Sequence, residues 1–155
     1  MTDKPSVLFA CVANSGRSVT ARVLAAYYGE DAVEAVSAGS EPGERIHPEV
    51  ADVLTGLGLD VSHETPKGFD PDGTYTAVVT MGCGDQCPYY SGARYEDWPL
   101  DDPKGQDEAT VRRIIADIDT RVRRLVAELA PDHDLPPSVL EQTRPSGPGS
   151  AATRR

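Results

Sequence analysis

Residues 7–18, with the sequence VLFACVANSGRS, decide the fold predicted for this chain. Residues 7–10 form an apolar run typical of a buried strand, and the Asn-Ser-Gly stretch that follows is typical of a tight loop. Residues 18–28 then carry the small and apolar side chains of a packed helix. A loop between a strand and a helix N-terminus directs several backbone N–H groups to one point, where the helix dipole favours negative charge.

This arrangement predicts a binding site for a tetrahedral oxyanion. The side chain of Arg17 can bind two oxygens of such an anion at once, because its guanidinium group is planar and presents paired donors. The backbone of the loop supplies the remaining donors. The predicted oxyanion-binding residues are Val12, Ala13, Asn14, Ser15, Gly16 and Arg17.

Cys11 is the predicted nucleophile of this site. A helix N-terminus and a nearby arginine both favour the thiolate form of a cysteine, and the thiolate is the reactive form. Ser18 can donate its hydroxyl hydrogen to the sulfur and so stabilise the thiolate. An isolated Cys-x5-Arg match is commonly a buried cysteine beside a surface arginine. Here strand, loop and helix follow one another in the order that an anion site requires, which favours the catalytic interpretation.

The composition limits the class of protein. A chain of 155 residues with 39% hydrophobic residues fits one domain with one core. The net charge of −10 argues against nucleic acid as a partner, and no apolar run approaches the roughly 18 residues of a membrane span. Three cysteines are too few for a secreted disulfide framework, so we expect reactive thiols in the cytoplasm.

The rest of the chain predicts alternating strands and helices. This alternation indicates an α/β fold, a single-domain open parallel sheet of about four strands flanked by helices, over residues 1–130. Proline, glycine, serine and charged residues dominate the end of the chain, so residues 131–155 are predicted to be a disordered tail. Further strands are predicted at residues 32–37, 75–81 and 93–98, and further helices at residues 48–57 and 107–129.

A pair of cysteines follows the predicted strand 75–81. Cys83 and Cys87 are four residues apart, which on a helical face places their Cα atoms about 6 Å apart, within the range that a disulfide spans. A zinc site would need two more ligands, and the three histidines of the chain do not offer them at a suitable spacing. We therefore expect a redox-active loop and no metal.

Asp102 follows the last predicted strand, and the carboxyl ends of parallel strands share one edge of the sheet. A carboxyl group above that edge could protonate a leaving oxygen. The alternative is that Asp102 belongs to a capping turn before the helix predicted at 107–129. The neighbouring Asp101 leaves the assignment of the acid open.

Together these motifs resemble the thioredoxin-coupled arsenate reductases, which share the low-molecular-weight protein tyrosine phosphatase fold. The resemblance covers residues 7–130. It rests on the Cys-x5-Arg-Ser motif at residues 11–18, the Val-Ser-Ala-Gly sequence at 36–39, the Val-Thr-Met-Gly-Cys sequence at 79–83 with a second cysteine after it, and the Trp-x2-Asp-Asp-Pro sequence at 98–103.

The resemblance implies a thiol relay that reduces arsenate to arsenite, with phosphate or sulfate as competing oxyanions. Cys11 would attack arsenate while Asp102 protonates the departing oxygen. Cys83 would then attack Cys11, and Cys87 would leave a Cys83–Cys87 disulfide for thioredoxin to reduce. No metal or organic cofactor is implied.

Three alternatives remain open at this point. The first is a low-molecular-weight protein tyrosine phosphatase, which would use the same loop and Asp102. Gly16 stands where phosphatases commonly carry a second cysteine, and Val19-Thr20 replaces their usual proline after Arg-Ser. The second is an arsenate reductase that uses a small thiol such as mycothiol and leaves the paired cysteines idle. The third is an anion sensor without catalytic activity.

Overall fold

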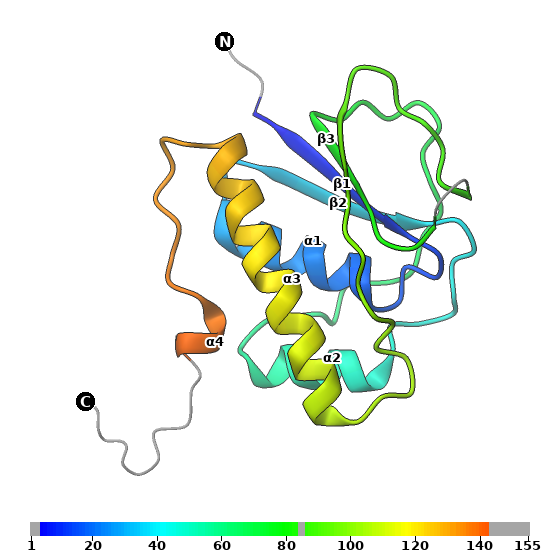
Figure 1. Ribbon diagram of the computed structural model, residues 1–155, viewed down its shortest axis with the longest axis vertical. Coiled ribbons are helices and arrows are strands. Elements are labelled where there is room, and N and C mark those ends of the chain that lie inside the picture. Colours follow the sequence, from blue (N-terminus) through cyan, green and yellow to red (C-terminus); the bar gives the residue numbers. More distant parts are fainter. Residues whose placement is uncertain (1–3, 84–85, 143–155) are drawn as a thin grey trace.

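The computed structural model describes residues 4–83 and 86–142, and its fold is α/β (Figure 1). Four parallel strands form one sheet in the order β2-β1-β3-β4, which confirms the predicted fold class. The elements in chain order are β1 (Ser6–Cys11), α1 (Arg17–Gly29), β2 (Glu34–Gly39), α2 (Pro48–Gly56), β3 (Ala77–Thr80), β4 (Arg94–Asp97), α3 (Glu108–Leu129) and α4 (Val139–Gln142).

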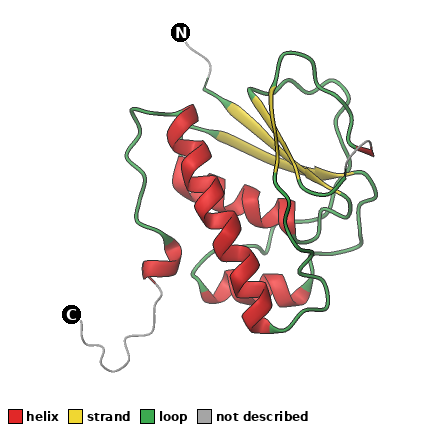
Figure 2. Ribbon diagram, in the orientation of Figure 1, coloured by secondary structure: helices red, strands yellow, loops and turns green. Residues whose placement is uncertain are grey.

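The two faces of the sheet are covered differently. Because side chains alternate along β1, Phe9 lies in the larger core with α1, α2 and α3, whereas Leu8 lies in a smaller core on the other face. Phe69, Tyr75 and Tyr90, which come from loops, cover that second face. Figure 2 shows the helices gathered on one side of the sheet and the long loops on the other.

The residues at the N-termini of α2 and α3 are of types that commonly begin helices. Pro48 stands in the first turn of α2, where its missing N–H costs no hydrogen bond. The side chain of Asp107 accepts a hydrogen bond of 2.9 Å from the N–H of Thr110 and so caps α3. None of the helices in the described residues is long and apolar enough to cross a membrane.

The chain remains packed beyond residue 130, which corrects the predicted start of disorder at residue 131. Val139 is buried, and its N–H donates to the Tyr28 hydroxyl at 2.9 Å. The buried carboxylate of Asp119 accepts hydrogen bonds from Tyr28 at 2.5 Å and from Ser138 at 2.8 Å. Burial and the contact with Asp119 raise the pKa of Tyr28 to about 12. Residues 131–142 therefore complete a buried polar network, and residues 143–155 lie outside the described part of the chain.

The register brings the predicted site elements to one edge of the sheet. Cys11 at the end of β1 pairs with Gly39 at the end of β2, and Ala10 pairs with Thr80 at the end of β3. A Cβ atom at Gly39 would lie only 2.4 Å from the backbone oxygen of Val12. The glycine is therefore required for the end of β2 to approach the loop that follows Cys11.

Candidate active site

A cavity of about 230 Å³ opens at this edge of the sheet. It contains the predicted nucleophile, most of the predicted oxyanion loop and the predicted acid. Of the loop residues, Asn14 alone does not line the cavity, and it is fully buried. The lining residues are Cys11, Val12, Ala13, Ser15, Gly16, Arg17, His47, Asp102 and Lys104.

The loop turns its carbonyl groups away from the cavity. The backbone oxygens of Cys11, Val12, Ala13 and Ser15 each accept a hydrogen bond of 2.8–3.1 Å from the segment at residues 40–47. Among the described residues, no hydrogen bond occupies the N–H groups of Ala13, Ser15 or Gly16. These donors are available to an anion, as the sequence predicts for a loop before a helix N-terminus.

The sulfur of Cys11 has two polar contacts. Its Sγ atom lies 2.8 Å from the hydroxyl oxygen of Ser18 and accepts a hydrogen bond of 3.2 Å from the N–H of Asn14. All three residues are buried. Two polar groups are thus directed at the sulfur of the predicted nucleophile.

A chain of hydrogen bonds fixes which way the Ser18 hydroxyl points. The N–H of Lys67 donates to the side-chain oxygen of Asn14 at 3.0 Å, which sets the orientation of that amide. The amide nitrogen of Asn14 then donates to Ser18 Oγ at 2.7 Å. Ser18 Oγ accepts that bond, and its own hydrogen is free to donate to Cys11. Asn14 also has a positive φ of 52°, a conformation that asparagine tolerates better than most residues.

Arg17 also lines the cavity and is held by contacts with two loops. Its Nη1 donates to the backbone oxygen of Leu100 at 3.3 Å, and its Nη2 lies 3.9 Å from the carboxylate of Asp102. A Cβ atom at Gly82 would lie 2.9 Å from Nη1, so only glycine leaves room for the guanidinium group there. The loops after β3 and β4 therefore jointly position the arginine.

The structure separates the two candidate acids. Asp102 lines the cavity near Arg17, whereas the carboxylate of Asp101 pairs with Arg113 at 3.5 Å. The carboxylate of Asp102 also accepts a hydrogen bond of 3.0 Å from the N–H of Lys104. The residue that caps α3 is Asp107. The capping role considered for Asp102 is therefore filled by Asp107.

Cys83 and Cys87 form a disulfide, with their Cα atoms 5.6 Å apart. The buried Cys83 Sγ lies 3.7 Å from the backbone oxygen of Ala10, the residue before the nucleophile. Cys11 and Cys83 belong to the cores on opposite faces of the sheet. Cys11 is free. In the described residues, no three His, Cys, Asp or Glu side chains are grouped so as to hold a metal ion.

His47 and Lys104 line the cavity, although no sequence motif predicted a functional role for either residue. His47 beside Pro48 is typical of a surface or capping residue, and it does precede the first turn of α2. Its N–H donates to the oxygen of Ser15 at 2.8 Å, which brings the residue to the cavity wall. No local sequence signal predicts this contact, because it depends on the packing of α2 against the loop.

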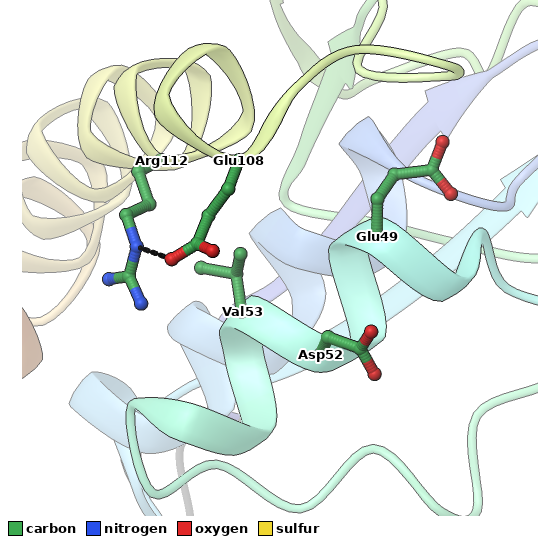
Figure 3. A pocket seen from close by; sticks show the side chains of 5 residues that line it. All are labelled: Glu49, Asp52, Val53, Glu108 and Arg112. Carbon is green, nitrogen blue, oxygen red and sulfur yellow. Dashed lines mark hydrogen bonds and ion pairs between the residues drawn. The ribbon is translucent and has the colours of Figure 1, made fainter.

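A second cavity of about 200 Å³ lies between α2 and α3 (Figure 3). Its wall includes Glu49, Asp52 and Val53 of α2 and the Glu108–Arg112 ion pair of α3. It contains no predicted nucleophile or oxyanion-binding residue. The cavity at Cys11 is therefore the candidate active site.

The fold and the site define a class of enzyme in which a strand-end cysteine, an anion-binding loop and an arginine act on a tetrahedral oxyanion. Residues 6–135 match the family described as low-molecular-weight phosphotyrosine protein phosphatase. The chain belongs to this family and, within it, to the group that includes the arsenate reductases.

Two curated relatives represent that group. A Halobacterium salinarum protein, provisionally named an arsenate reductase, is 37% identical over 131 residues, which cover 80% of this chain and 92% of the relative. The glutaredoxin arsenate reductase of a Synechocystis species is 30% identical over 129 residues, which cover 80% of this chain and 98% of the relative.

Two solved structures are also similar. The thioredoxin-dependent arsenate reductase of Corynebacterium glutamicum is 42% identical, with a TM-score of 0.73. The match covers 83% of this chain and 63% of that chain, so this protein spans less than two thirds of its length. An arsenate reductase in a phosphate-binding state is 30% identical, with a TM-score of 0.73, and the match covers 81% of this chain and 98% of that one.

Proposed function

We propose that this chain reduces arsenate to arsenite through a three-cysteine relay that a thioredoxin-type protein regenerates in the cytoplasm. The observation that carries the proposal is the Cys83–Cys87 disulfide beside the strand that ends in Cys11. A phosphatase needs only the nucleophile, the loop and the acid. The names of the relatives support the same activity.

In the first step, the free N–H groups of the loop and the Arg17 guanidinium bind arsenate, as they would bind phosphate or sulfate. The Cys11 thiolate forms a bond to arsenic, and one oxygen leaves as water after Asp102 supplies a proton. Arsenic remains in the +5 state. Cys11 is now bonded to arsenic in a covalent adduct.

In the second step, the Cys83 thiolate attacks Cys11 Sγ. A sulfur–sulfur bond forms, the sulfur–arsenic bond breaks, and its electron pair stays on arsenic, which leaves as arsenite in the +3 state. The two cysteines supply the two electrons. Because Cys11 and Cys83 lie on opposite faces of the sheet, this step requires the segment after β3 to move around the end of β1.

In the third step, the Cys87 thiolate attacks Cys83 Sγ and releases the Cys11 thiolate. This step would leave Cys83 bonded to Cys87 and Cys11 free, and the Cys83–Cys87 disulfide and free Cys11 of the structure are consistent with it. An external dithiol then reduces the disulfide by the same exchange chemistry. Thioredoxin is our first candidate for this reductant, and a glutaredoxin with glutathione is the second.

The proposal is tested by arsenate-dependent NADPH oxidation in the presence of thioredoxin and thioredoxin reductase. Phosphatase turnover of an aryl phosphate is measured on the same protein. We expect steady turnover with arsenate. Slow or absent arsenate turnover together with rapid phosphate-ester hydrolysis would instead indicate a phosphatase. A phosphatase would use the same loop and Asp102.

Cysteine variants separate the relay from a small-thiol reductase. Cys87→Ser, given one equivalent of arsenate without a reductant, should complete one turnover and trap a Cys11–Cys83 disulfide that peptide mass mapping detects. Cys83→Ser should fail to complete that turnover. If both variants cycle at the wild-type rate with thioredoxin, or if mycothiol alone supports them, the relay is wrong.

A further inference from the structure

The N-terminus of α2 contacts both halves of the active site. The N–H of His47 donates to the oxygen of Ser15 in the nucleophile loop at 2.8 Å. Two residues later, the carboxylate of Glu49 accepts a hydrogen bond of 2.5 Å from the N–H of Gly105, in the loop that carries Asp102. One rigid helix end thus connects the loop of the nucleophile to the loop of the acid.

The contact with Glu49 is the shortest polar tie between the Asp102 loop and the rest of the protein. The carboxylate of Asp102 lies 3.9 Å from Arg17, and the ion pair of Asp101 with Arg113 is 3.5 Å long between exposed side chains. Within the described part of the chain, the other hydrogen bonds of the loop at residues 102–106 are internal to it. Glu49 therefore joins the loop to α2 by a shorter contact than either ion pair makes with α1 or α3.

We propose that Glu49 is a positioning residue that holds Asp102 over the oxyanion site by anchoring the Gly105 amide to α2. The role is distinct from catalysis, because Glu49 is not among the residues that line the Cys11 cavity. Since it assigns the acid role to Asp102, the inference rests on the proposed function.

The carboxylate is suited to this role. The N–H groups of Glu49 itself and of Gly105 both donate to it, and these bonds hold the pKa of Glu49 below its usual value. The side chain is therefore ionised at neutral pH, and a hydrogen bond to an ionised acceptor is shorter and stronger than one between neutral groups. A glutamine at this position would keep an acceptor oxygen without the charge.

Asp52 provides a matched control. It is an acidic residue one turn further along α2, and it lines the same cavity between α2 and α3 as Glu49 (Figure 3). In the described residues, no hydrogen bond or ion pair joins it to the Asp102 loop. Removing its charge changes the local field of α2 and leaves the anchor intact.

The experiment compares Glu49→Ala, Glu49→Gln and Asp52→Ala in the full chain. A rapid-quench single turnover measures the rate of arsenite release. Phosphate affinity and the rate of Cys11 alkylation by iodoacetamide report on the oxyanion loop. The chemical shift of the Gly105 amide proton reports on the anchor itself and does not depend on turnover.

We expect Glu49→Ala to slow arsenite release about tenfold, as a small displacement of a catalytic group does, with phosphate affinity and alkylation within twofold of wild type. Glu49→Gln should recover most of the rate, and Asp52→Ala should match wild type. The Gly105 amide proton should move upfield in Glu49→Ala, move less in Glu49→Gln and stay in place in Asp52→Ala.

Three results would overturn the inference. Wild-type release by Glu49→Ala would show that the anchor is dispensable, and an unchanged Gly105 shift would show that it does not form in solution. Equal losses of release and of alkylation would show that Glu49 shapes the nucleophile loop instead. If the wild-type protein does not reduce arsenate at all, the proposed function fails, and the Gly105 shift still decides whether the anchor exists.

Discussion

Replacement of Ser18 by alanine tests how the site activates its nucleophile. Ser18 is fully buried, and its hydroxyl lies 2.8 Å from Cys11 Sγ with its hydrogen directed there by Asn14. A hydrogen bond to a charged group contributes about 1.5–3 kcal/mol. Since about 1.4 kcal/mol corresponds to a factor of ten, the loss of this bond in Ser18→Ala should weaken the stabilisation of charge on the sulfur about 10- to 100-fold.

The reactivity of the remaining thiolate offsets part of this loss. A less stabilised thiolate is more nucleophilic, with a Brønsted coefficient of about 0.4–0.5, so about half of the effect in logarithmic units is recovered. We therefore expect Cys11 alkylation by iodoacetamide to slow about three- to tenfold. Arsenite release in a single turnover should slow by a similar factor.

Thr20→Val is the matched control for this prediction. The hydroxyl of Thr20 is also buried and donates to the oxygen of Gly16 at 2.8 Å, but it does not contact the sulfur. The control should alkylate within twofold of wild type. Wild-type alkylation by Ser18→Ala would refute the hydrogen bond as the source of activation, and an equal loss in Thr20→Val would assign the effect to loop geometry.

Three further predictions follow from particular contacts. Asp102→Asn should slow arsenite release at least about 100-fold in rapid-quench assays and leave Cys11 alkylation nearly unchanged. Asp101→Asn should have little effect on either rate. The reverse pattern would make Asp101 the acid. Gly39→Ala should weaken phosphate binding, measured by calorimetry, because the new Cβ would lie 2.4 Å from a backbone oxygen of the nucleophile loop; unchanged affinity would contradict this steric reasoning. Hydrogen bonds, with Arg124 first, lower the pKa of Glu96 from 4.5 to about 2, so its contribution is complete above about pH 5 and is lost as the pH falls towards 2. Glu96→Gln should lower the free energy of unfolding by about 1–2 kcal/mol at pH 7 in urea titrations, because the partner arginines are exposed and solvent screens the ion pairs. A difference from wild type that does not shrink by pH 3 would contradict this.

The elements with strong periodic patterns could be predicted from the sequence. The apolar run before Cys11 and the 3.6-residue period of α3 fix a strand and a helix with little dependence on the rest of the chain. The strand predicted at residues 32–37 is shifted to Glu34–Gly39, because residues 29–32 form a turn closed by a hydrogen bond from Ala32 to Gly29. The sequence did not indicate that all the long helices lie on one face of the sheet.

The packed segment at residues 131–142 was missed because prolines and polar residues dominate it. One signal was present in α3. Asp119 falls within the apolar stripe of that helix, and a buried carboxylate requires hydrogen-bond donors from elsewhere. Tyr28 supplies one donor and Ser138 supplies the other. A charged residue on the buried face of a helix thus predicted a covering segment, although not which one.

At the active site, residue types could be predicted but their orientations could not. The spacing of Cys11, Arg17 and Ser18 follows from the loop and the first turn of α1, and these contacts are local. The direction of the Ser18 hydroxyl is set by Asn14, whose amide is oriented by the backbone of Lys67, 53 residues further along the chain. A chain with the same Cys-x5-Arg spacing but no such donor would place its cysteine in the same way. The hydroxyl hydrogen of the neighbouring serine would then have no fixed direction. The nucleophile is therefore a property of the local sequence, and its activation is a property of the whole fold.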